Sequence, residues 1–205
     1  MIREMPEDEF AREFFAEFAD LECGDHFHAG NPQHVEWVRK RIAIYYFRGG
    51  RFYAHCLPDG TPTGFAAVLI DPGLEGRNCF GHKAELLDVI IRETYRGKGY
   101  GSALLGHAEA EARAAGAYCL YVATYAGNAD SMTFYINRGF VPVALHPDVH
   151  GPGDEGEVHL RKILRLIFGS LGRLRASRVL CANDLAGRRP CFSSKCSANN
   201  RTDIA

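Results

Sequence analysis

The segment from Tyr95 to Ser102, with the sequence Tyr-Arg-Gly-Lys-Gly-Tyr-Gly-Ser, decides the fold of this 205-residue chain. It lies between an apolar run at 84–91 (AELLDVII) and an Ala- and Leu-rich stretch at 101–115. Glycines let backbone amides approach a ligand closely, and the N-terminus of a following helix presents free N–H groups and a positive dipole. We therefore expect the segment to bind an anion, most naturally a phosphate, with Arg96 and Lys98 adding positive charge.

Two commoner phosphate-binding motifs do not fit this spacing. A Walker loop requires a glycine five residues before the Gly-Lys pair and a Ser or Thr after it, whereas Arg92 and Gly99 occupy these positions. A dinucleotide-binding fingerprint requires a third glycine where the chain has Leu104. The remaining pattern is Arg-x-x-Gly-x-Gly, from Arg96 to Gly101, placed after a predicted strand and before a predicted helix.

A second motif follows the apolar segment 118–124. Asn128 is followed by Tyr135 seven residues later and by the pair Gly139 and Phe140. Together with the glycine-rich loop, this motif resembles the GNAT N-acetyltransferase superfamily over residues 2–164. The chain departs from the family where a Val-x-Pro sequence usually precedes the loop, because it has Ile91-Arg92-Glu93 instead.

Hydrophobic periodicity predicts the element order β-α-α-β-β-β-α-β-α-β-β, which is a mixed α/β domain. One helix after Pro6 is expected to bury Phe10, Phe14, Phe15 and Phe18 and to continue to Leu21. The resemblance implies a mixed, mostly antiparallel sheet flanked by helices, with two splayed parallel central strands at 84–91 and 118–124. The other predicted strands are 2–5, 51–57, 64–71, 140–145 and 157–161, and the other predicted helices are 35–47, 101–115 and 128–137.

Charge and composition divide the chain into two parts. Residues 161–205 carry ten basic and two acidic side chains, whereas residues 1–25 carry nine acidic and two basic ones. We expect an acetyltransferase domain at 1–164 and a basic, disordered tail at 165–205. Nucleic-acid binding by this tail is not favoured, since basic tails are more often simply solvated. The seven cysteines form no CxxC pair, and no apolar run is long enough to span a membrane, so we predict a cytoplasmic protein with reduced thiols.

The resemblance also implies acetyl-CoA as co-substrate and assigns the residues that bind it. Tyr135 would be the general acid for the leaving thiolate, and the main-chain N–H of Ile91 would stabilise the oxyanion. The general base is open among Asp88, Glu85, Glu93 and water, with Asp88 preferred; Glu85 and Asp88, three apart on a strand, are expected on opposite faces. The implied cofactor-binding residues are Ile91, Arg96, Gly97, Lys98, Gly99, Tyr100, Gly101, Ser102, Asn128 and Tyr135.

The acceptor is expected to be a primary amine of a small molecule, bound by the loops at 21–32 and 72–83. A protein amino group is the alternative, and a non-catalytic acyl-CoA-binding module is less favoured because Tyr135 and the phosphate loop are both present. Acidic residues near the first loop either attract a cationic amine or form a solvated helix face; they are Glu17, Asp20, Glu22 and Asp25. No metal is expected, because Cys23, Asp25, His26 and His28 lack a second ligand pair, and a homodimer is left open.

Overall fold

The computed structural model describes residues 1–23, 27–70, 83–149 and 151–164, and it confirms the α/β class. Seven strands form one sheet in the order β1-β2-β3-β4-β5-β7-β6. Among these strands β4 and β5 pair in parallel, and the other neighbours are antiparallel. The strands are β1 (Ile2–Met5), β2 (Gly50–Cys56), β3 (Pro62–Ile70), β4 (Lys83–Ile91), β5 (Cys119–Tyr125), β6 (Val141–His146) and β7 (Glu157–Ile163).

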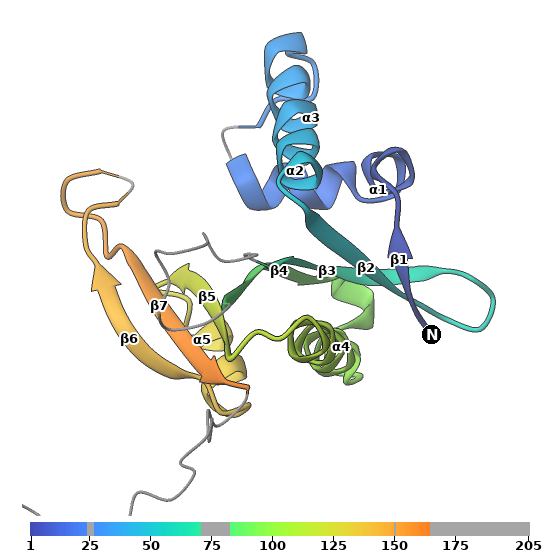
Figure 1. The fold of residues 1–205 in the computed structure, drawn as a ribbon. Coiled ribbons are helices and arrows are strands. Elements are labelled where there is room, and N and C mark those ends of the chain that lie inside the picture. Colours follow the sequence, from blue (N-terminus) through green and yellow to red (C-terminus); the bar gives the residue numbers. More distant parts are fainter. Residues whose placement is uncertain (24–26, 71–82, 150, 165–205) are drawn as a thin grey trace, which may run out of the picture. The chain divides into compact units, whose positions relative to one another are not determined.

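The helices cover both faces of the β2–β4 half of the sheet (Figure 1). On one face lie α1 (Glu7–Glu13), α2 (Phe15–Cys23) and α3 (Pro32–Phe47), and on the opposite face lies α4 (Tyr100–Ala114). The short helix α5 (Ala129–Ile136) contributes Tyr135 to the same core as α4. None of the helices in the described ranges is long and apolar enough to cross a membrane.

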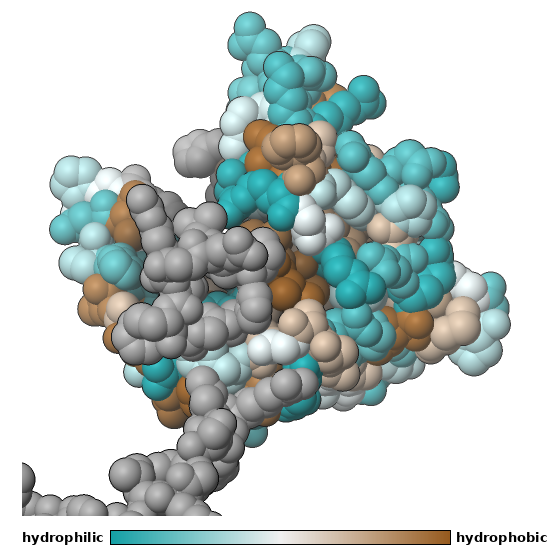
Figure 2. Space-filling model, viewed as in Figure 1, coloured by the Kyte–Doolittle hydropathy of each residue, from teal (hydrophilic) through white to brown (hydrophobic). Residues whose placement is uncertain are grey.

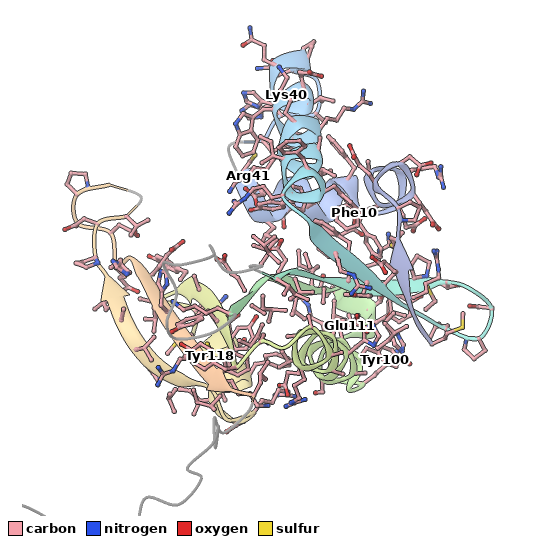
Figure 3. All side chains as sticks on the ribbon, in the orientation of Figure 1. Phe10, Lys40, Arg41, Tyr100, Glu111 and Tyr118 are labelled. Carbon is pink, nitrogen blue, oxygen red and sulfur yellow. The ribbon has the colours of Figure 1, made fainter. Side chains whose placement is uncertain are left out.

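Two hydrophobic cores follow from the alternation of side chains along the strands. In β3, Phe65 and Ala67 pack into the core under α1–α3, whereas Ala66 and Val68 pack into the core under α4. Phe10 is the centre of the first core, with its ring centroid 4.4 Å from that of Phe52 and 4.8 Å from that of Phe65; Figure 3 shows it between α1 and the sheet. Burial on both faces explains why these strands read as continuous apolar runs.

The N-terminal helix differs from the prediction, because it is broken into α1 and α2. Phe14 caps α1 with a φ of −122°, outside the helical region. The phenylalanine prediction is confirmed for Phe10, Phe14 and Phe18, which are fully buried, whereas Phe15 is only partly buried against the same core. Leu21 is 48% exposed, so the buried side of α2 ends at Phe18 and Ala19. The sequence has no Pro or Gly at this point to indicate the break.

A β-bulge in β4 overturns the prediction that Glu85 and Asp88 lie on opposite faces. Ala67 pairs with Asp88 but the next residue of β3, Val68, pairs with Leu86, so Leu87 is an extra residue. The alternation of side chains therefore changes phase. Before the bulge Ala84 and Leu86 face the α4 core, and after it Val89 and Ile91 do so. Glu85 and Asp88 consequently share the other face, which is the side of α1–α3.

The parallel pairing of β4 with β5 is short and ends where the bulge begins. It joins Lys83–Leu86 to Cys119–Val122, and the two strands separate beyond that point (Figure 1). This confirms the predicted pair of splayed strands. At the far edge, β6 pairs only with β7 among the described strands, and hydrophobic side chains reach the surface there (Figure 2), with Val141, Val143 and Leu145 all more than 40% exposed. Of the predicted loop at 72–83, Lys83 begins β4, and residues 72–82, like the tail at 165–205, lie outside the described residues.

Candidate active site

The glycine-rich loop forms an open cradle at the N-terminus of α4. Gly97 and Gly99 have φ values of +74° and +83°, which favour glycine, and Gly99 is the N-cap of the helix. A Cβ atom built on either glycine would meet nothing within 4 Å, so there is open space directly in front of the free N–H groups of the first helical turn. This arrangement fits an anionic phosphate group.

The two basic residues of this loop fold back onto its own backbone. The Nε of Arg96 donates to the Ile91 carbonyl at 3.1 Å, and the Nζ of Lys98 donates to the Thr94 carbonyl at 3.2 Å. The Arg96 contact joins the loop directly to the end of β4. The positive charge is thus placed beside the cradle, and the spacing between the loop and the strand is fixed.

The backbone of β4 turns one edge toward the opening between the splayed strands. The Arg92 N–H donates to the Thr63 carbonyl of β3 at 2.9 Å. Successive N–H groups of a strand point to opposite edges, so the N–H of Ile91 points away from β3 and toward the opening. Gly64 of β3 lies so close to this strand that a Cβ there would be 2.2 Å from the Ile90 carbonyl oxygen. The geometry is therefore compatible with the predicted oxyanion role of Ile91.

Arg92 is a residue whose importance the sequence did not indicate. Its guanidinium donates to Glu17 at 2.6 Å, to Glu13 through both the side chain and the carbonyl, and to the Pro62 carbonyl at 3.1 Å. It also lies over the Phe14 ring. Arg92 therefore fastens α1 and α2 to the end of β4, and Glu17 is an ion-pair partner and not a solvated acid.

Asp88 lies at the bulge, facing a network on α2 and α3. There Glu22 accepts from the Arg41 Nε and from the Tyr45 hydroxyl, each at 2.9 Å, and only 12% of its side chain is exposed. Figure 3 shows Arg41 on α3. The Oδ2 atom of Asp88 is buried and has no hydrogen-bond partner among the described residues. Burial, and then the charge of Glu22, raise the pKa of Asp88 to about 7.

Tyr135 lies in the core that α4 covers. Its ring packs edge-on against Phe134 and Phe140, and the residue is 7% exposed. Burial, and to a smaller extent the charge of Asp88, raise the pKa of Tyr135 well above its ordinary value. The phenol therefore keeps its proton at any physiological pH.

Asn128 caps α5, because its Oδ1 accepts from the Ser131 N–H at 3.0 Å. We expect Asn128→Ala to lower the free energy of unfolding by about 1 kcal/mol, since it removes the cap, and Asn128→Ser to stay close to the wild type. Urea denaturation of the three proteins measures the difference. Equal stability of the Ala variant and the wild type would contradict the cap, and weaker acetyl-CoA binding in the Ser variant would reveal a separate contact with the cofactor.

Arg138 is a second residue that the sequence analysis missed. It follows α5 and donates to the Ser102 hydroxyl in the first turn of α4 and to the Phe134 carbonyl at 2.8 Å. Its guanidinium lies 3.8 Å from the centroid of the Phe134 ring. This cation joins α5, which carries Tyr135, to the helix that begins at the cradle. The sequence feature that could have indicated Arg138 is its position directly before the motif residue Gly139.

Other expectations have mixed outcomes. Glu22 is paired and Asp20 is exposed, while Asp25 and His26 lie outside the described residues. Within the ranges that the structure covers, no group of three or more His, Cys, Asp or Glu side chains could hold a metal ion. Glu93 begins a 3₁₀ turn, Glu93–Tyr95, after the end of β4, and it is not part of the network around Asp88.

Comparison with known proteins identifies the family. The model of the acetyltransferase (GNAT) family matches residues 8–140. The chain therefore belongs to the GNAT family, whose members are N-acetyltransferases that use acetyl-CoA. A search of curated proteins found no match.

Solved structures show the same fold at low sequence identity. A GNAT-family protein from Desulfovibrio desulfuricans has 19% identity and a TM-score of 0.59, over 80% of this chain and 99% of that one. The ribosomal-protein-alanine N-acetyltransferase from Brucella melitensis has 22% identity and a TM-score of 0.59, over 80% and 99%. The protein yncA from Salmonella typhimurium, solved with acetyl-CoA, has 21% identity and a TM-score of 0.59, over 80% and 94%.

Proposed function

We propose that this protein transfers the acetyl group of acetyl-CoA directly to the primary amine of a small molecule. The observation that carries the proposal is the unpartnered, buried Oδ2 of Asp88, which lies where β4 and β5 separate. A buried carboxylate oxygen without a donor is costly, and an amine would supply that donor. The pKa of about 7 suits a general base near neutral pH.

Each residue around the opening would have a distinct role in the acetyl transfer. Acetyl-CoA supplies the acetyl group as a thioester, and the cradle from Arg96 to Ser102 fits its pyrophosphate. Asp88 would accept the proton of the amine, and the Ile91 N–H would donate to the carbonyl oxygen as its negative charge develops. Tyr135 would donate its proton to the leaving sulfur. The unpaired edge of β4 and the cap residue Asn128 would hold the pantetheine arm.

The size of the acceptor is inferred from the surroundings of Asp88. Glu22 and Tyr45 are themselves enclosed, and they converge on the side of the sheet where the acceptor amine would approach. This confined approach favours a small amine over a folded protein surface. The test is a thiol-release assay with acetyl-CoA against panels of small amines, amino acids and peptides, followed by mass spectrometry of the products. Acetylation of protein amino groups alone would replace the small-molecule proposal with the protein alternative.

The cradle can be tested through cofactor binding alone. Acetyl-CoA should raise the melting temperature, because it binds only the folded state. In Gly99→Asp, a carboxylate would face the pyrophosphate, and we expect the Kd for acetyl-CoA to rise at least ~10-fold, since like charges in contact cost more than 1.4 kcal/mol. Gly106→Asp is the matched control: Gly106 is an exposed glycine of the same helix with nothing within 4 Å of its Cβ position. Equal binding by all three proteins would show that the phosphates lie elsewhere.

A further inference from the structure

Two buried side-chain atoms in the described ranges have no hydrogen-bond partner, and both lie near the acceptor side of the sheet. They are the Oδ2 of Asp88 on β4 and the Nε of Arg161 on β7. Native proteins leave few buried polar atoms unsatisfied, so each such atom needs an explanation. For Asp88, the explanation is the amine that would react there. Arg161 has no role in the acetyl transfer described above.

The strand register places Arg161 on the same face as Asp88. Across the sheet Glu85 pairs with Tyr121, and Tyr121 pairs with Arg161, and directly opposed residues of neighbouring strands share a face. The neighbour of Arg161 in β7, Leu160, packs into the α4 core, so Arg161 points to the opposite side. Because the bulge puts Asp88 on the face of Glu85, the carboxylate and the guanidinium face the same space.

The distance between the two groups suits a small bifunctional ligand. Their strands are separated by β5, which puts the two backbones roughly 10 Å apart. From Glu85 to Asp88, β4 advances by two positions of β3 because of the bulge, which adds about 7 Å in the strand direction. The side chains of Asp88 and Arg161 span part of this separation. A ligand with two functional groups only a few bonds apart can span the remainder.

The charge on this face identifies the second functional group as a monoanion. The ionisable side chains on the Arg161 face of β4, β5 and β7 are Lys83, Glu85, Cys119, Tyr121, His159 and Glu157. Glu157 lies beside His159, with 3.7 Å between its Oε2 and the His159 Nε2. Lys83 lies over the Tyr121 ring and its charge offsets that of Glu85, while burial raises the pKa of the Cys119 thiol and keeps it neutral. In the part of the chain that the structure covers, Arg161 forms no ion pair. Arg161 is thus a single guanidinium without an ion-pair partner among the described residues, and one guanidinium matches a carboxylate better than a doubly charged phosphate.

We propose that the acceptor is an amine that also carries a carboxylate, as in a free amino acid, and that Arg161 binds this carboxylate. The inference rests on the proposed acetyl transfer and specifies its substrate. A guanidinium binds a carboxylate through two parallel hydrogen bonds, which fixes orientation as well as position. With the carboxylate held on β7, the amine is directed toward Asp88 at the splay of β4. Arg161 is thus a specificity-determining residue and takes no part in proton transfer.

The first test compares matched acceptors on the wild-type protein. Each amino acid that is acetylated is paired with its carboxamide and with the amine that lacks the carboxyl group. We expect kcat/KM to fall about 10- to 100-fold when the carboxylate is removed, because hydrogen bonds to charged groups contribute about 1.5–3 kcal/mol. Equal rates within each pair would overturn the inference while leaving acetyl transfer intact. No acetylation of any amine would instead contradict the proposed function.

The second test removes the cation. Arg161→Met should raise KM for amino acids by about 10- to 100-fold with little change in kcat, and it should not affect the kinetics with carboxyl-free amines. In the presence of CoA, an amino acid should raise the melting temperature of the wild type but not that of this variant. Arg161→Lys should restore part of the affinity. Arg39→Met removes the same charge from an exposed position on α3 and should behave like the wild type. Equal losses for both classes of acceptor in Arg161→Met would show that the arginine acts only on the structure.

Discussion

Replacement of Tyr135 by Phe is expected to lower kcat by about 10²–10⁴-fold while the Kd for acetyl-CoA stays within about twofold. The substitution keeps the ring, which is 7% exposed and packs against Phe134 and Phe140. Only the hydroxyl is lost, and with it the proton for the leaving thiolate. Steady-state kinetics on an identified acceptor, together with calorimetric titration of acetyl-CoA, separate the catalytic effect from binding.

Tyr118→Phe provides the matched control for this experiment. Tyr118 precedes β5, at the end of the strand away from the opening, and its phenol pKa is also raised by burial. Loss of that hydroxyl should leave kcat unchanged. If Tyr135→Phe retained the wild-type kcat under conditions where chemistry limits the rate, the proton would come from water and Tyr135 would be a packing residue.

The sequence predicted the parts of the site that depend on local backbone chemistry. Gly97 and Gly99 are predicted cradle residues because glycine lets backbone amides approach a ligand closely, and both adopt the positive φ that favours glycine. The apolar runs at 84–91 and 118–124 indicated buried central strands, and these are the parallel pair β4 and β5. A helix is predicted over 128–137, and the side chain of Asn128 caps α5 at its start. In each case, the residue type and its immediate neighbours were sufficient.

The parts that the sequence did not predict depend on contacts between distant segments. Arg92 acts through Glu13 and Glu17, which are more than 70 positions earlier in the chain. The bulge at Leu87 is specified by the pairing with β3, and no Gly or Pro in β4 signals it. A strand without a bulge alternates its side chains strictly, which would put Glu85 and Asp88 on opposite faces. The sequence alone therefore does not show that Asp88 shares a face with Glu85 and Arg161.

The bulge also determines the expected behaviour of Asp88→Asn. This variant should lose about 10²–10⁴-fold in kcat, because an amide cannot accept the proton of the amine. In the wild type, activity should rise with pH as the carboxyl ionises around its pKa of about 7, and this limb of the profile should disappear in the variant. Glu85→Gln is the control from the same face: Glu85 is exposed, and its loss should leave the limb in place.

Stability should change in the opposite direction to activity. The pKa of Asp88 is raised from 3.8 to about 7 in the folded state, so the neutral acid is compatible with the fold and ionisation destabilises it. The contribution of Asp88 to the free energy of unfolding is therefore fully present below about pH 4, and it is lost as the pH rises through about 7. Asp88→Asn cannot ionise, and its melting temperature relative to the wild type should increase between pH 5 and pH 8. A variant that keeps the activity limb would place the titrating base elsewhere, with Glu85, Glu93 and water as the remaining candidates.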